Sequence, residues 1–191
     1  MTMVVADMSM SVDGFVAGPH TDADHPLGVG GELLHRWLFA DPQDPRDSEV
    51  AAEVSAAVGA VVLGRRTFDV GVDIWDDVPF PAPSFVVTHR PEPERVMTSG
   101  RFTFVTDGVP EAITRARVAA GDKNVQLMGG ETVQQAIATG LLDELQITLV
   151  PILLGRGVRM FDSLPADHVD LVRTRVITSP AVTHLRFRLN S

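Results

Sequence analysis

Short apolar runs alternate with segments of helical periodicity along most of the chain. Continuous apolar runs bounded by turn residues are typical of strands that are covered on both faces of a parallel sheet. The runs predict strands at residues 3–8, 60–63, 84–87, 102–105, 125–128 and 144–154. After the first of these, residues 9–18 are predicted to stay extended. Two further strands, 169–177 and 182–189, are predicted at the end of the chain, joined at Ser179-Pro180.

Apolar residues spaced by three or four predict the helices between these strands. Three of the predicted helices are 32–39, 107–120 and 131–139. Another is predicted to begin at a cap formed by Asp47 or Ser48 and to run to about Val58. Gly59, Gly121 and Gly140 are predicted to stop three of them. Residues 20–31 and 70–83 are predicted to be loops, because the first is polar and glycine-rich and the second contains three prolines.

The last strand alternates cleanly between apolar and polar residues, which predicts an antiparallel hairpin with one solvated face. Leu185, Phe187 and Leu189 would point inward, and His184, Arg186 and Arg188 outward. Strands that alternate with helices and end in a hairpin predict an α/β fold. We expect a single domain over residues 1–191: a three-layer α/β/α sandwich with a mostly parallel central sheet and a C-terminal antiparallel hairpin.

Composition narrows the class of partner. The formal net charge of −9 argues against nucleic acid and anionic membranes as partners. The absence of cysteine excludes disulfides, thiolate metal sites and a cysteine nucleophile, and it fits a reducing compartment. No signal peptide or membrane span is evident, so we expect a cytoplasmic protein.

Three predicted strands end in residues suited to binding phosphate. Gly64 to Thr67, Thr88 to Arg90 and Gly129 to Thr132 each follow a strand directly. Glycines allow a close approach to the backbone, and helix N-termini and arginines attract anions. Each junction alone is equally explained by a tight turn or by solvated charges. Because carboxyl ends of parallel strands share one edge of the sheet, the three together predict an elongated site for a multi-phosphate ligand.

Two motifs in the first loop have simpler explanations. His20, Asp22, Asp24 and His25 are metal-ligand types, but four donors in one loop are more often solvated, and we predict no metal site. Gly28 to Gly31 contains part of a dinucleotide-binding pattern. It follows a loop rather than a strand, so the structural context of that motif is missing.

The chain resembles the dihydrofolate reductase-like fold and, more closely, the stand-alone reductase domain of the bifunctional deaminase-reductases of riboflavin biosynthesis. The segments that carry the resemblance cover nearly the whole chain in the family's order. They are MSMSVDGFVAG (8–18), VVLGRRTF (61–68), FVVTHRP (85–91), VQLMGGETV (125–133) and DELQITLVPILLGRG (143–157). The resemblance implies NADPH as cofactor, a small heterocyclic substrate and a homodimer.

The resemblance also implies roles for the matching residues. The cofactor phosphates, adenosine and nicotinamide would contact residues on four of these segments, with Asp13 and Gly14 also near the substrate. These are Met8, Ser9, Val16, Gly64, Arg65, Arg66, Thr67, Thr88, His89, Arg90, Met128, Gly129, Gly130, Glu131 and Thr132. In such a reaction the cofactor carries the hydride, and the protein supplies orientation, water exclusion and one proton.

The catalytic residues are less well defined. Folate-reducing relatives carry a carboxylate on the first helix, for which Glu32 is a candidate, with a solvated glutamate as the alternative. Asp13 is a second candidate, with a turn residue as the alternative. The riboflavin reductases usually have an acidic residue where this chain has Met128. The leading hypothesis is therefore reduction of a pyrimidine- or pteridine-like heterocycle, such as an aminouracil phosphoribosyl compound. The alternatives are dihydrofolate reduction and a nucleotide-binding protein without catalysis.

Overall fold

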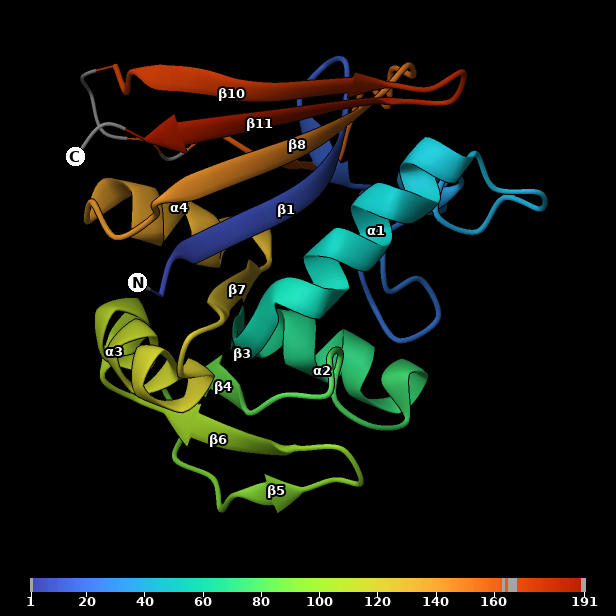
Figure 1. Ribbon diagram of the computed structural model, residues 1–191. Helices are drawn as coiled ribbons and strands as arrows, with labels where there is room; N and C mark the ends of the chain where they lie inside the picture. The colour runs from blue at the N-terminus through green and yellow to red at the C-terminus, as the bar shows by residue number, and fades with distance from the viewer. Residues whose placement is uncertain (1, 163, 165–167, 190–191) are drawn as a thin grey trace.

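A computed structural model describes residues 2–162, 164 and 168–189. One nine-stranded sheet runs through the molecule, in the order β10-β11-β8-β1-β7-β3-β4-β6-β5 (Figure 1). Its strands are β1 (Val4–Ser11), β3 (Val58–Gly64), β4 (Ser84–Val87), β5 (Arg95–Val96), β6 (Arg101–Val105), β7 (Asn124–Met128), β8 (Glu144–Val150), β10 (Leu171–Thr178) and β11 (Thr183–Leu189). A separate two-stranded sheet pairs β2 (Phe15–Ala17) with β9 (Val158–Arg159).

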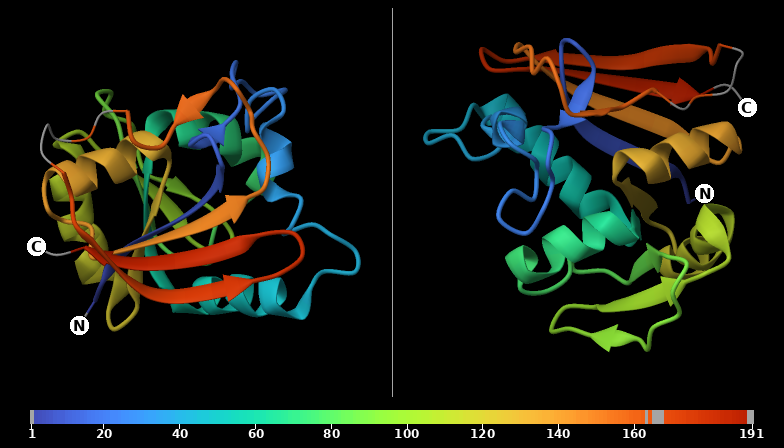
Figure 2. Two further views of the ribbon diagram at one scale, coloured as in Figure 1. Left: turned by 90° about the horizontal axis from the view of Figure 1, so that it is seen from above. Right: turned by 180° about the vertical axis from the view of Figure 1, so that it is seen from behind.

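The centre of the sheet is parallel, as predicted. Strands β8, β1, β7, β3, β4 and β6 pair in parallel, while β11 pairs antiparallel to β8 and β10 antiparallel to β11. The hairpin β10–β11 forms one edge of the sheet and β5 forms the other (Figure 2). The predicted mostly parallel sheet with a C-terminal antiparallel hairpin is therefore confirmed.

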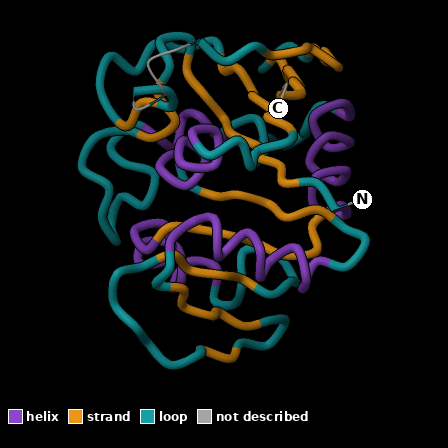
Figure 3. The backbone as a smooth tube through the Cα atoms, turned by 90° about the vertical axis from the view of Figure 1, so that its left-hand side faces the viewer, coloured by secondary structure: helices purple, strands orange, loops and turns teal. Residues whose placement is uncertain are grey.

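Helices cover both faces of the sheet (Figure 3). They are the 3₁₀ helix η1 (Gly31–His35) and the α-helices α1 (Pro45–Ala57), α2 (Arg65–Trp75), α3 (Gly108–Ala120) and α4 (Gly130–Ala138). Apolar residues of α3 and α4 pack with one face of β1, β3 and β7 in the largest core cluster. Phe68 and Val72 of α2 pack with the opposite face of β3, beside β4 and β6. In the described part of the chain, no helix combines the length and apolar character needed to cross a membrane.

Several predicted boundaries are wrong for identifiable reasons. Asp44, not Asp47 or Ser48, caps α1, because its carboxylate accepts a hydrogen bond from the backbone N–H of Arg46 at 2.9 Å. Gly59 does not stop that helix but lies within β3. A Cβ atom at this position would lie 2.5 Å from the carbonyl oxygen of Ala120, so the glycine allows α3 to pack closely.

Two elements also differ in type or length from the predictions. The helix predicted at 32–39 is only the short 3₁₀ helix η1, and the strand predicted at 144–154 ends at Val150. The loop predicted at 70–83 begins later, because α2 continues to Trp75. Gly71 lies inside α2 where a Cβ atom would come within 2.3 Å of the Trp75 ring. The absence of a side chain at Gly71 therefore leaves room for the Trp75 ring.

Candidate functional site

The first and third predicted phosphate junctions lie side by side at the carboxyl edge of the sheet. Strands β3 and β7 are neighbours, and Leu63 pairs with Met128 at the ends of the two strands. Helix α2 therefore begins directly beside helix α4. The second junction, at Thr88, follows β4, which is the neighbour of β3 on its other side.

The glycines of the two adjacent junctions are needed because two threonine hydroxyls crowd them. A Cβ atom on Gly129 would lie 2.6 Å from Oγ1 of Thr67, and the φ angle of Gly129 is +92°. A Cβ atom on Gly64 would lie 3.3 Å from Oγ1 of Thr132. The structure thus brings four of the predicted site residues together in a small backbone cradle with hydroxyl groups beside it.

Helices α2, α3 and α4 all begin at this edge, and none has a side-chain cap at its N-terminus. Helix α1, by contrast, is capped by Asp44. The uncapped backbone N–H groups and the positive ends of the helix dipoles favour an anion here. The cradle between α2 and α4 has two such helix ends and is therefore suited to a phosphate or pyrophosphate group.

The basic residues at this edge differ in availability. Arg65 forms ion pairs with Asp69, at 2.8 Å, and with Glu92, and its guanidinium lies 5.6 Å from the centre of the Phe68 ring. These two carboxylates compete with an anion for the guanidinium of Arg65, so it is a weaker candidate phosphate ligand than Arg66 and Arg90, and its role stays a prediction. Arg66 contacts the side chain of Thr21 in the first loop.

The Thr88 junction presents two exposed basic side chains at the neighbouring strand end. Thr88 is buried, and its Oγ1 accepts a hydrogen bond from the backbone N–H of Arg90 at 3.1 Å. The side chains of His89 and Arg90 are exposed beyond it. Because β4 lies next to β3, these side chains lie on the same edge as the cradle.

The predicted nicotinamide border divides between two faces of the sheet. Met8 packs against the core under α3 and α4. Ser9 points to the other face, where its Oγ accepts a hydrogen bond from Nε1 of Trp37 at 3.0 Å. Val16 approaches Gly130, since a Cβ on Gly130 would lie 3.6 Å from Cγ2 of Val16. Met128 is half-buried in the second core cluster, and Glu131 is exposed.

Asp13 holds two loops together and is a poor proton donor. Its carboxylate accepts hydrogen bonds from the Ser11 hydroxyl at 2.7 Å and from the backbone N–H groups of Leu154 at 3.0 Å and Gly155 at 2.7 Å. The hydrogen bond from Ser11 is the main cause that lowers the pKa of Asp13 to about 2. At neutral pH this carboxyl stays ionised, which agrees with a turn residue rather than a catalytic acid.

Glu32 does not lie on the first α-helix. It is an exposed residue in the first turn of η1, which agrees with the solvated alternative rather than the catalytic one. The carboxylate that the first α-helix directs inward is Asp47, which is 1% exposed. Asp47 and Val50 are three residues apart and are the two buried residues of α1. Their spacing is the signal in the sequence that could have identified Asp47 as inward-facing.

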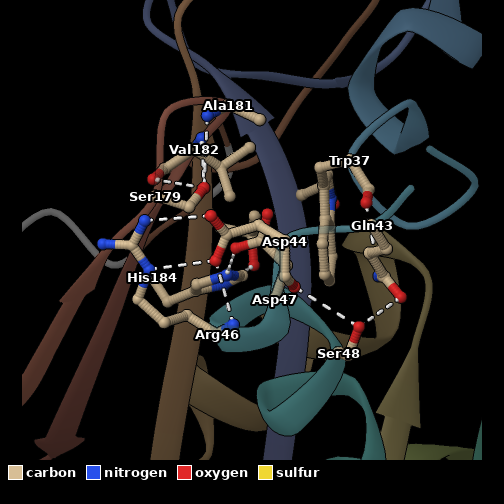
Figure 4. A network of polar contacts seen from close by, with 12 residues as sticks. Trp37, Gln43, Asp44, Arg46, Asp47, Ser48, Ser179, Ala181, Val182 and His184 are labelled. Carbon is tan, nitrogen blue, oxygen red and sulfur yellow. Dashed lines mark hydrogen bonds and ion pairs between the residues drawn. The ribbon is translucent and has the colours of Figure 1, made fainter. Parts of the chain in front are cut away.

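Asp47 belongs to a buried polar chain between α1 and the sheet (Figure 4). Its Oδ1 lies 2.9 Å from Nε2 of His184, and Nδ1 of that ring lies 2.9 Å from Oγ1 of Thr148. The edge of the Trp37 ring packs on His184 with 5.0 Å between ring centres. Ser9, Thr148 and His184 are cross-strand partners on β1, β8 and β11.

The prediction that His184 points to solvent is therefore wrong. His184 is 3% exposed, because α1 and Trp37 cover the polar face of β11. Arg186 on the same face pairs with Glu53 of α1 at 2.8 Å. The alternation correctly separated the two faces of the strand, but it carried no information about a helix covering the polar one.

The fold and this edge define an α/β protein of the dihydrofolate reductase-like class. A family model described as the RibD C-terminal domain matches residues 2–183, and the chain belongs to that family of reductase domains. The resemblance expected from the sequence is thereby confirmed.

Solved structures with this fold cover essentially the whole chain. A protein from Shewanella sp. PV-4, provisionally assigned to riboflavin biosynthesis, is 23% identical, with a TM-score of 0.77 and full coverage of both chains. A diaminohydroxyphosphoribosylaminopyrimidine deaminase/5-amino-6-(5-phosphoribosylamino)uracil reductase from Thermotoga maritima is 12% identical, with a TM-score of 0.66, over 99% of this chain and 57% of that one. Dihydrofolate reductase from Enterococcus faecalis, in complex with NADP(H), is 13% identical, with a TM-score of 0.58, over 99% and 97%. At these identities the structures establish the fold.

Proposed function

We propose that this protein is an NADPH-dependent reductase of a small pyrimidine- or pteridine-like heterocycle. The observation that carries the proposal is the cradle at Gly64, Thr67, Gly129 and Thr132, where two uncapped helices begin beside each other. A dinucleotide needs such a site for its pyrophosphate. The similarity to a dihydrofolate reductase in complex with NADP(H) supports the same cofactor class.

In this proposal, different residues of the carboxyl edge bind different parts of the cofactor. Gly129 to Thr132 and Gly64 to Thr67 would hold the pyrophosphate through backbone N–H and threonine hydroxyl groups. Arg66 and Arg90 would bind the additional phosphate that distinguishes NADPH from NADH, since Arg65 is neutralised by Asp69 and Glu92. Val16 would border the nicotinamide beside Gly130, and Ser9 would contribute to the same border through its place on β1, since its side chain points to the other face.

The cofactor would supply the hydride, and the protein would supply position and shielding. Trp37 holds the hydroxyl of Ser9 in place, and the Asp47–His184–Thr148 chain supports Trp37 from behind. Asp13 fixes the loop that follows β1 against residues 154 and 155. These contacts keep the border of the site rigid without providing a nucleophile.

For the substrate we propose the aminouracil class that the family and the Thermotoga neighbour suggest. Dihydrofolate is the alternative substrate. Asp47 is the carboxylate that the first helix directs inward, but it is paired with His184. A nucleotide-binding protein without catalysis is the alternative of another class, and Met128 in place of an acidic residue favours it.

The test is a titration with NADPH and NADH, monitored by the fluorescence of Trp37 and Trp75. We expect quenching with a preference for NADPH. Replacing Arg66 or Arg90 by alanine should reduce that preference by about tenfold or more, the value of one charge-assisted phosphate contact. Arg101→Ala, an exposed residue at the opposite end of β6, is the matched control and should leave it unchanged.

Each outcome has a separate meaning. Absence of binding by either nucleotide would refute the reductase assignment. Binding of NADPH with an unchanged preference in both arginine variants would refute the phosphate assignment only. Binding without oxidation of NADPH in the presence of the aminouracil substrate or dihydrofolate would favour the non-catalytic alternative.

A further inference from the structure

A cavity lies away from the carboxyl edge, between α1 and the first halves of the central strands. Its volume is about 230 Å³. One water molecule occupies roughly 30 Å³, and pockets for drug-sized molecules begin at about 300 Å³, so the cavity can hold a ligand that is larger than a few waters and smaller than a drug-sized molecule. Met3 lines it and is 38% exposed, so the cavity reaches the surface there.

One wall of the cavity is a polar row that crosses three strands. Asp7 pairs with Gln146, which pairs with Arg186, on β1, β8 and β11 respectively. Arg186 donates two hydrogen bonds to Oε1 of Gln146, at 2.8 and 3.0 Å, and Nε2 of Gln146 donates to Oδ2 of Asp7 at 3.1 Å. The opposite wall is aliphatic, with Val54, Ala57 and Val58.

Two acceptors in this wall are under-used. Gln126 is 3% exposed, and its side chain makes one long hydrogen bond in the described structure, from Nε2 to the carbonyl oxygen of Leu127 at 3.3 Å. Asp7 accepts one side-chain hydrogen bond, from Gln146, and has no ion-pair partner among the described residues. Both side chains line the cavity, so each has an oxygen that can accept a further hydrogen bond from a group bound there.

The charges around the cavity favour a cation. Arg186 is the basic residue of the lining, and it is neutralised by Glu53 at 2.8 Å and Glu144 at 3.5 Å. Glu53 also pairs with Arg175 of β10. Among the described residues, Asp7 has no ion-pair partner of its own. Helix α1 ends at Ala57 with no basic residue in its last turn, so the negative end of its dipole also faces this region.

We propose that this cavity binds a small planar cation of the amidine or guanidine class. Its N–H groups would pair with the free oxygen of Asp7 and with Oε1 of Gln126, and its flat apolar body would lie against Val54 and Ala57. A carboxylate is the matching partner for such a fork of donors. This site is separate from the nucleotide edge, and the proposal does not depend on the proposed reductase activity.

The probe is benzamidine, titrated into the nucleotide-free protein by calorimetry at pH 8, with neutral benzamide as the matched compound. We expect one molecule of benzamidine to bind per chain. Asp7→Asn, which keeps the shape but removes the charge, should weaken binding by about tenfold or more. Ala57→Met, which fills the cavity, should weaken it similarly. Glu49→Gln removes an exposed charge on the same helix and should have no effect.

Any of three results would overturn the proposal. The first is no binding of benzamidine to the parent protein, and the second is that the Asp7→Asn and Ala57→Met variants bind benzamidine as tightly as the parent protein. The third is that benzamide binds as tightly as benzamidine. NADPH titration of the same variants serves as a second measurement. Both variants should bind NADPH as the parent protein does, whatever that affinity is. If a variant lost binding of both benzamidine and NADPH, the substitution would have disturbed the fold. Val54→Met, which fills the cavity from a different position, would then replace that variant in the benzamidine titration.

Discussion

Asp7 offers a quantitative test of the polar layer under α1. It is a half-buried carboxylate on the central strand β1, and burial raises its pKa from 3.8 to about 6, although Gln146 and Arg186 act in the opposite direction. Charged groups from every packed element surround it, namely Glu53, Glu144 and Arg186. We predict that Asp7→Asn stabilises the protein at pH 8.

The magnitude follows from linkage between protonation and folding. Below pH 3.8 the carboxyl is neutral in both states and costs nothing. Between pH 3.8 and about 6 the carboxyl ionises in the unfolded state but stays protonated in the folded state, so the free energy of unfolding falls over this range. Above about pH 6 the carboxyl is ionised in both states, and the full cost of the poorly solvated charge is present. Each pKa unit corresponds to about 1.4 kcal/mol, so the full cost at pH 8 is about 3 kcal/mol. Because the asparagine amide must also be desolvated, we expect a gain of about 1–3 kcal/mol.

The assay is urea unfolding of the parent protein and of Asp7→Asn, at pH 8 and at pH 4.5. The gain should be larger at pH 8 by about 2 kcal/mol, since Asp7 is mostly protonated in the folded state at pH 4.5. The melting temperature at pH 8 should rise by about 3–10 °C for a chain of this size. Glu49→Gln, an exposed carboxylate on α1, is the control and should change neither value. A destabilised Asp7→Asn at pH 8, or a gain that does not depend on pH, would refute the assignment of an uncompensated buried charge.

Three further substitutions test the rest of the molecule. Gly129→Ala should destabilise the fold by about 1–3 kcal/mol in chemical denaturation, because the residue adopts a positive φ and has no room for a Cβ. The same substitution should weaken NADPH binding, and an unchanged NADPH titration would count against the cradle as the phosphate site. His184→Ala should cost about 3–5 kcal/mol by leaving Asp47 buried without its partner, whereas His184→Ala combined with Asp47→Ala should cost less than the sum of the two single changes. Asp13→Ala should increase hydrogen exchange at the two backbone N–H groups that it holds in the following loop, and unchanged protection there would show that the carboxylate does not fix the loop.

The sequence predicted those parts of the site that depend on the order of strand, glycine and helix along the chain. A strand followed at once by glycine and a helix places that glycine at a carboxyl edge, whatever the rest of the fold does. Gly64 and Gly129 were identified in this way, and the structure brings them together because β3 and β7 are neighbours. The state of each cation was not predictable, since Arg65 is neutralised by Glu92 from 27 residues away.

The sequence by itself determined the alternation of strands and helices, the parallel centre of the sheet, the C-terminal hairpin and the glycine junctions, because these depend on periodicity and on residues close in the chain. Only the tertiary structure decided which polar faces are covered. His184 and Asp47 are 137 residues apart, and their contact exists because α1 packs across β11. The same packing leaves the cavity beside Asp7, since α1 buries only two of its residues against a polar sheet face. The burial of these polar side chains depends on contacts between elements that are distant in the sequence, so it cannot be predicted from a local pattern of residues.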